Sequence, residues 1–185
     1  MKKVLVIGSN SFAGSNFIDF LLSLNYQVFG VSRSKEINRI FLKYKNNKKL
    51  KNFIFKKINL NLDKDINKLT GIIKKNKIQY IVNFAAQGMV AESWITPQDW
   101  YLTNVVSNAK LINKISKLKI SKYLNFSTPE VYGNTSKMLS EGLNFQPNTP
   151  YAISRAAQDF NLIAYYKNFN FPITITRAAN IIFIN

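Results

Sequence analysis

Short aliphatic runs alternate with amphipathic stretches along most of the chain. Lys3 to Ile7 is an aliphatic run that ends in a glycine turn, and Phe12 to Leu24 carries apolar residues at helical spacing. Further strands are predicted at residues 27–31, 53–58, 80–84, 123–126 and 173–176, with helical stretches between most of them. Such alternation predicts parallel strands with helices on both faces. We therefore expect an α/β fold, a doubly wound parallel sheet of about six strands.

One stretch departs from this pattern. Residues 36–50 are basic and poorly periodic, and we interpret them as a loop with a short helix rather than a domain boundary. The chain contains no repeat, linker or low-complexity tract. Its 185 residues fit a single domain, here residues 1–185, with enough apolar side chains to form a core.

Composition restricts the possible chemistry. The sequence contains neither cysteine nor histidine, which excludes disulfides and metal sites built on thiolate or imidazole. Acid and base catalysis would therefore depend on tyrosine, lysine, arginine and carboxylates, and we expect no metal. The apolar run near the N-terminus is too short for a signal peptide or a membrane span. We expect a cytoplasmic protein without a membrane partner.

The formal net charge of +17 raises the alternative of a basic nucleic-acid-binding protein. The lysines are dispersed, however, and asparagine and isoleucine are also abundant, as AT-rich codons would produce. We therefore expect no nucleic-acid partner. The alternative predicts salt-sensitive binding to DNA.

Three segments carry a family resemblance: Gly8 to Gly14, Ser127 to Gly133 and Tyr151 to Arg155. Together they resemble the extended short-chain dehydrogenase/reductase family, the NAD(P)-dependent epimerases and dehydratases of nucleotide sugars. Among these, the chain is similar to the dTDP-glucose and GDP-mannose 4,6-dehydratases. The resemblance implies a Rossmann-type domain that binds NAD(P) and a nucleotide-sugar substrate.

The first segment matches a dinucleotide-binding turn. In a doubly wound fold the pyrophosphate lies at the N-terminus of the first helix, and small residues allow its close approach. Gly8 and Gly14 meet that need, whereas Ser11 replaces the family's middle glycine and adds a side chain near the phosphate. We assign Phe12 and Ala13, at the start of the helix, to the same cofactor site. An ordinary tight strand-to-helix turn remains the alternative.

The end of the second strand bears on the choice of cofactor. NAD enzymes usually place an acid here, whereas NADP enzymes supply an arginine for the 2′-phosphate. With Ser32 and Arg33 at these positions, NADP is favoured and NAD remains possible. The segment is similar to that of the NADP-dependent GDP-mannose 4,6-dehydratases. A solvated surface arginine is the alternative.

The resemblance implies further contacts with the dinucleotide at Asn59, Leu60, Ala85, Ala86 and Gln87. Gln87 also approaches the sugar substrate. Asn104 matches an asparagine that braces the sheet and the active site, so we interpret it as a support residue rather than a catalyst.

The family's reaction implies roles for four residues: Thr128, Glu130, Tyr151 and Arg155. Tyr151 is the expected base for hydride removal at C4 of a hexose. Arg155 stands where the family has a lysine, which lowers the pKa of the tyrosine and contacts the cofactor ribose. Thr128 is expected to hydrogen-bond the substrate hydroxyl and the tyrosine, and Glu130 to remove the C5 proton. Two alternatives are a surface Tyr-x-x-x-Arg pair and a Glu130 that only caps a loop.

Two departures and the expected absence of the C-terminal lobe favour a second hypothesis, a non-catalytic NAD(P)-binding remnant. Pro129 stands where dTDP-glucose dehydratases have a proton-donating aspartate, and Arg155 replaces the lysine. The resemblance assigns Asn180 to the substrate phosphate, but the family's C-terminal substrate-binding lobe is expected to be absent from 1–185. Helices at Gln98 to Leu118 and Tyr151 to Lys167 are expected to form the interface of a homodimer.

Overall fold

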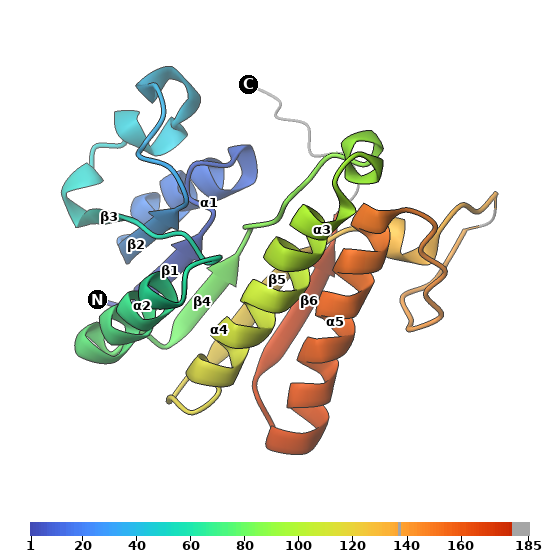
Figure 1. Cartoon of the computed structure of the whole chain (residues 1–185). Helices are drawn as coiled ribbons and strands as arrows, with labels where there is room; N and C mark the ends of the chain where they lie inside the picture. The colour runs from blue at the N-terminus through green and yellow to red at the C-terminus, as the bar shows by residue number, and fades with distance from the viewer. Residues whose placement is uncertain (137, 179–185) are drawn as a thin grey trace.

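The computed structural model describes residues 1–136 and 138–178. Six strands form one parallel sheet in the order β3-β2-β1-β4-β5-β6. The strands are β1 Lys3–Ile7, β2 Gln27–Ser32, β3 Phe53–Lys57, β4 Tyr80–Asn83, β5 Lys122–Ser127 and β6 Ile173–Arg177. Helices lie on both faces of the sheet (Figure 1). The predicted Rossmann-type fold is therefore confirmed.

The strand order places a topological switch between β1 and β4. Ile7, the last residue of β1, is in register with Val31 of β2 on one side and with Asn83 of β4 on the other. Connections after β1 and β4 run in opposite directions, so a crevice opens beyond the carboxyl ends of these strands. This is the position at which open α/β sheets bind ligands.

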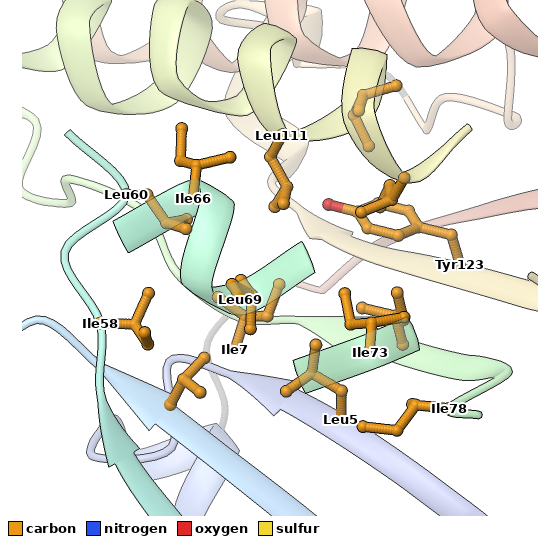
Figure 2. Close-up of a cluster of buried hydrophobic side chains, with 14 of the residues drawn as sticks. Leu5, Ile7, Ile58, Leu60, Ile66, Leu69, Ile73, Ile78, Leu111 and Tyr123 are labelled. Carbon is orange, nitrogen blue, oxygen red and sulfur yellow. The ribbon is translucent and has the colours of Figure 1, made fainter. Parts of the chain in front are cut away.

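One face of the sheet is covered by α2 Asp63–Asn76, α4 Asn108–Ile115 and α5 Pro150–Phe169, which lie side by side in Figure 1. Their apolar residues pack on alternate residues of the strands because successive strand side chains point to opposite faces. Figure 2 shows the centre of this core, where Leu5 and Ile7 meet Ile66, Leu69 and Leu111.

The opposite face of the sheet packs against α1 Phe12–Ser23. Val4 and Val6 of β1 point to this face and meet Ile18 and Leu22 of the helix. A second core therefore lies on the other side of the same strands. Alternation along β1 thus buries both faces of the strand, as expected for a central parallel strand.

The basic stretch after β2 contains three short 3₁₀ helices instead of the single helix expected. They are η1 Arg39–Phe41, η2 Lys43–Asn46 and η3 Leu50–Asn52. Leu42 and Tyr44 are fully buried in the core beside α1, so two side chains anchor a segment whose overall pattern is polar. Such isolated anchors produce no periodicity.

The helix expected at 98–118 is interrupted. It consists of α3 Pro97–Trp100, the π-helix η5 Tyr101–Ser107 and α4. Asn108 Nδ2 donates a hydrogen bond to the Thr103 carbonyl oxygen, five residues earlier, at 3.0 Å. π-Helical turns such as those of η5 often occur at functional sites. Two further 3₁₀ helices are η4 Ala91–Trp94 and η6 Pro129–Tyr132.

In the described ranges 1–136 and 138–178, no helix has the length and apolarity that crossing a membrane would require.

Candidate active site

The turn after β1 is shaped by two close approaches. Gly8 has a φ of +86°, and a Cβ there would lie 2.8 Å from the backbone nitrogen of Ala85. A Cβ on Gly14 would lie 2.3 Å from the Gly8 carbonyl oxygen. Both distances are shorter than real Cβ contacts, so the turn, α1 and the end of β4 pack too closely for side chains at these positions.

Ser11 caps α1 rather than pointing its hydroxyl toward a ligand. Its Oγ donates to the Gly8 carbonyl oxygen at 2.7 Å and accepts from the Gly14 amide at 3.0 Å. A serine at this N-cap position satisfies a helix amide that would otherwise lack an intrahelical partner. Phe12 and Ala13 follow in the first turn of the helix, and the Phe12 side chain is exposed.

The end of β2 is tied to the same turn. Ser32 Oγ accepts a hydrogen bond from the Asn10 amide at 2.9 Å and lies 3.2 Å from Ser9 Oγ. Asn10 Nδ2 in turn donates to the Lys35 carbonyl oxygen at 2.8 Å. Ser32 therefore has a structural task in addition to leaving this position uncharged.

Arg33 extends from this edge with an exposed side chain. Its Nη1 donates to Gln87 Oε1 across 3.5 Å, at the long limit of a hydrogen bond. A weak contact of this kind leaves the guanidinium available to an anionic ligand at the mouth of the crevice.

A cavity of about 370 Å³ opens beyond the carboxyl ends of β1, β2 and β4. It brings together nine of the predicted cofactor residues: Gly8, Ser11, Ser32, Arg33, Asn59, Leu60, Ala85, Ala86 and Gln87. Phe12, Ala13 and Gly14 do not line it, because they form the helix start behind the turn. Three other residues predicted to contact the cofactor, Asn104, Tyr151 and Arg155, do not line it either. The cavity walls thus join segments that are far apart in the sequence.

Asn61 also lines this cavity and was missed in the sequence. Its Nδ2 donates to Thr103 Oγ1 at 3.1 Å, and its Oδ1 accepts from Ser107 Oγ at 2.8 Å. Its position two residues after Asn59, in the loop that follows β3, was the available signal. The loop is thereby fixed to the π-helix.

Asn104 joins the wall of this cavity to α5. Its fully buried amide accepts from the Gln87 backbone N–H at 2.8 Å and donates to the Gln87 carbonyl oxygen at 3.0 Å. The same group donates to Ser154 Oγ at 2.9 Å, and that hydroxyl donates to the Tyr151 carbonyl oxygen at 2.7 Å. These contacts suit a support residue.

Thr128 and Glu130 lie at the end of β5 and in η6. Thr128 is buried, and its Oγ1 accepts a hydrogen bond from the Glu130 amide at 3.3 Å. Glu130 faces a second cavity of about 870 Å³, which is also lined by Tyr132, Glu141 and Arg177. The Thr128 hydroxyl thus caps the turn that carries the glutamate.

Tyr151 and Arg155 lie one turn apart on α5, as their spacing predicts. The Tyr151 amide donates to Ser93 Oγ at 3.2 Å. No hydrogen bond joins the Tyr151 and Thr128 side chains within the described ranges. Arg155 is only 2% exposed and donates from Nη2 to the Phe126 carbonyl oxygen, so it does not belong to a surface pair.

The guanidinium of Arg155 lies in an unusual environment. Burial lowers its pKa, while the nearby Tyr151, Asp159 and Tyr123 oppose that shift. Among the described residues, neither its Nε nor its Nη1 has a hydrogen-bond partner. Two donors close to Tyr151 are therefore unsatisfied in the interior, which is costly unless a ligand or water accepts from them.

Asp159 forms the centre of a buried polar cluster that was missed in the sequence. Its carboxylate accepts from Ser127 Oγ at 2.8 Å, from Asn125 Nδ2 at 3.2 Å and from Arg177 Nη2 at 3.2 Å. Burial raises the pKa of Asp159, and the Ser127 hydroxyl and the two arginines oppose that rise. Its spacing of four residues from Arg155 was the only local signal.

Asn180, the predicted phosphate contact, lies outside the described residues. Within the described ranges, no group of three or more histidine, cysteine, aspartate or glutamate side chains could hold a metal ion.

Comparison with known proteins gives consistent matches. Residues 5–182 match a family model described as GDP-mannose 4,6 dehydratase. The human dTDP-D-glucose 4,6-dehydratase is 30% identical over 184 residues, which cover 97% of this chain and 51% of that protein. The chain therefore spans about half the length of the curated relatives that it matches.

Solved structures agree with this match. The dTDP-glucose 4,6-dehydratase of Streptomyces venezuelae, solved with NAD, gives a TM-score of 0.83 at 27% identity and covers 95% of this chain and 55% of that one. The UDP-glucuronic acid 4-epimerase of Bacillus cereus, in complex with UDP-glucuronic acid and NAD, gives 0.79 at 29% identity with the same coverage.

Proposed function

The chain belongs to the family described as GDP-mannose 4,6 dehydratase, as its three motifs indicated, and we propose that it forms the dinucleotide-binding half of a nucleotide-sugar 4,6-dehydratase or epimerase. One observation carries the proposal. The cavity at the switch between β1 and β4 gathers nine residues expected to contact a dinucleotide, next to a turn in which Gly8 and Gly14 leave no room for a side chain. The whole reaction would require the rest of the relatives' length.

The residues present fit a nicotinamide dinucleotide. The turn after Gly8 would take the pyrophosphate, Asn59 and Leu60 the adenine, and Ala85 to Gln87 the nicotinamide half. When bound, the cofactor supplies a hydride acceptor for C4 of the hexose. NADP is the preferred form in this proposal because Arg33, held only by a weak contact with Gln87, offers a cation near an uncharged Ser32, and NAD is the alternative.

A titration tests the cofactor choice. Parent protein should bind NADP(H) more tightly than NAD(H), and Arg33→Ala should weaken NADP(H) selectively, by about tenfold, through loss of one charge-assisted contact. Arg39→Ala is a matched control, since that arginine pairs with Asn46 and does not line the cavity. Equal affinities for both cofactors would overturn the NADP preference, and binding of neither would overturn the proposed function.

In the catalytic proposal Tyr151 takes the proton of the C4 hydroxyl, with Thr128 oriented toward the same hydroxyl. Arg155, one turn later on the same helix, places a positive charge close to Tyr151. Glu130 faces the larger cavity and would remove the C5 proton before water leaves from C6. Pro129 cannot donate the last proton, so water or another residue supplies it.

Variants of a protein that spans the relatives' full length test these roles. Tyr151→Phe should abolish hydride transfer and retain NADP binding, because the phenol serves the proton and not the pyrophosphate. Glu130→Gln should allow C4 oxidation, seen as nicotinamide absorbance, without forming a 4-keto-6-deoxy product. Arg155→Lys should retain or raise turnover. Turnover at the parent rate by Tyr151→Phe would contradict the assignment.

A non-catalytic NAD(P)-binding protein is the second candidate. Pro129 at the position of the acid and the contact of Arg155 with the Phe126 carbonyl oxygen favour it. This candidate predicts dinucleotide binding without turnover of any nucleotide sugar, even in the full-length protein.

Assembly and location complete the proposal. Leu102 and Val106 of η5 and Ile153 and Phe160 of α5 are apolar and exposed, which supports a homodimer through these helices. Sedimentation should detect dimers at micromolar concentration, and a strictly monomeric folded protein would contradict the proposed homodimer.

A cytoplasmic location is consistent with a chain without cysteine.

A further inference from the structure

Arg177, at the carboxyl end of β6, connects three parts of the molecule. Its Nη2 pairs with Asp159 of α5 at 3.2 Å, and its Nη1 donates to the Tyr132 hydroxyl of η6 at 3.0 Å. We propose that Arg177 is a positioning residue that fixes the Glu130-bearing turn and the following loop over the larger cavity. The inference rests on the proposed function, since it assigns this clamp to the step that Glu130 performs.

The clamp is rigid at its inner end. Asp159 is completely buried and is held by Ser127 and Asn125 from the neighbouring strand β5. An arginine bound to such a carboxylate has few alternative positions, because its planar head fixes the direction of several donors at once. The Arg177 guanidinium is thereby oriented before it reaches η6.

The outer end of Arg177 lies against two neighbouring aromatic rings. Its guanidinium carbon is 5.2 Å from the centre of the Tyr132 ring and 4.8 Å from the centre of the Phe145 ring. The two rings meet edge to face at 5.7 Å, and Phe145 also contacts Phe160 of α5. Cation–π contacts with both rings hold η6 and the loop against the same cation.

The Tyr132 hydroxyl extends this connection to the loop. It donates to the Gly142 carbonyl oxygen and accepts from the Gly142 amide, both at 3.2 Å, in addition to the bond from Arg177. A further link lies nearby, where the Gln146 amide donates to the Val131 carbonyl oxygen at 3.0 Å. The returning loop is therefore bound to η6 at both Tyr132 and Val131.

The consequence concerns Glu130. It lies two residues before Tyr132 in η6, and both line the larger cavity with Arg177. A general base must be held within reach of the proton that it removes, and small displacements reduce its rate strongly. By fixing Tyr132, the Asp159–Arg177 pair fixes the turn from which Glu130 reaches the substrate.

Hydrogen exchange of the parent and two variants tests the clamp. Tyr132→Phe keeps the ring in contact with Arg177 and Phe145 and removes only the hydroxyl, whereas Arg177→Lys keeps the positive charge and loses the planar, forked guanidinium. Each variant should raise exchange of the Gly142 and Gln146 amides by about tenfold, with exchange in β1 unchanged. Tyr166→Phe is a matched control on the exposed face of α5. It should leave amide exchange unchanged both in the loop and in β1.

Exchange that stays at the parent level in the loop, or that rises equally in β1, would overturn the proposal. In a full-length protein, Tyr132→Phe should also slow exchange of the C5 hydrogen with solvent by about tenfold while C4 oxidation keeps its rate. Equal slowing of both steps would overturn it. Failure of the parent to bind NADP(H) or NAD(H) would contradict the proposed function alone, because the amide exchange needs no ligand.

Discussion

The carboxyl ends of β1 and β2 and those of β5 and β6 are stabilised by different physical means. At β1 and β2 the glycine turn is held by small residues, close backbone approach and short-range caps, with Gly8 and Gly14 at its centre. At β5 and β6 the region that carries Thr128 and Glu130 is held by buried charge, with Asp159 close to Arg155 and paired with Arg177. Steric restriction within one turn produces a motif that can be recognised in the sequence. A charged cluster whose members come from separate elements produces no such motif.

The largest expected effect lies on the charged side. Asp159→Asn should lower the free energy of unfolding by about 3–5 kcal/mol, because the buried Arg155 and the partly buried Arg177 lose a buried negative charge beside them. Urea unfolding measures this. Asp63→Asn is the matched control: its pair with Lys110 is exposed, and the change should be below about 1 kcal/mol. Equal effects of the two variants would show that the charged cluster does not stabilise this half.

Alkaline pH tests a tyrosine on each side. Burial raises the pKa of Tyr44, beside α1, and of Tyr123, in β5. A folded pKa above the unfolded value of about 10 means that stability is complete below that pH and is lost above it, by about 1.4 kcal/mol per pH unit for each group. Tyr44→Phe and Tyr123→Phe should each reduce the slope with which stability falls as pH rises. Unfolding followed by circular dichroism at rising pH checks it, and an unchanged slope in both variants would be contrary to expectation.

The glycine turn should be sensitive to a single methyl group. Gly14→Ala places a carbon 2.3 Å from the Gly8 carbonyl oxygen and should lower stability by about 1–3 kcal/mol through overpacking. Gly71→Ala is the matched control in α2, where an added Cβ would meet no atom within 4 Å beyond its chain neighbours and its own helix backbone, and should raise stability by about 0.5–1 kcal/mol. Thermal unfolding distinguishes the two. A neutral Gly14→Ala would show that the turn can open.

The smallest expected effect is at the end of β2. Ser32→Ala removes the acceptor for the Asn10 amide and should lower stability by about 0.5–1.5 kcal/mol. Ser121→Ala, at an exposed position before β5, should change stability by less than about 0.5 kcal/mol. Chemical unfolding of both proteins provides the comparison, and identical midpoints would remove Ser32 from the structural account.

Much of the fold could be predicted from local patterns. The first strand begins and ends where its aliphatic run does, and β2 to β6 lie within two residues of their predicted bounds. The two errors have a common cause. The anchors Leu42 and Tyr44 and the π-helix around Asn104 depend on contacts with other elements, so neither produces the regular spacing from which helices are recognised.

The sequence by itself determined the alternation of strands and helices and the glycine turn, because both depend on the chemistry of neighbouring residues. It also placed Tyr151 and Arg155 one turn apart on a helix. Only the tertiary structure decided that the Arg155 guanidinium lies inside the protein and that Asp159 shares its surroundings with Arg177. The physical reason is that burial and charge pairing arise when β5, β6 and α5 pack together, and no local spacing encodes which side chains that packing encloses.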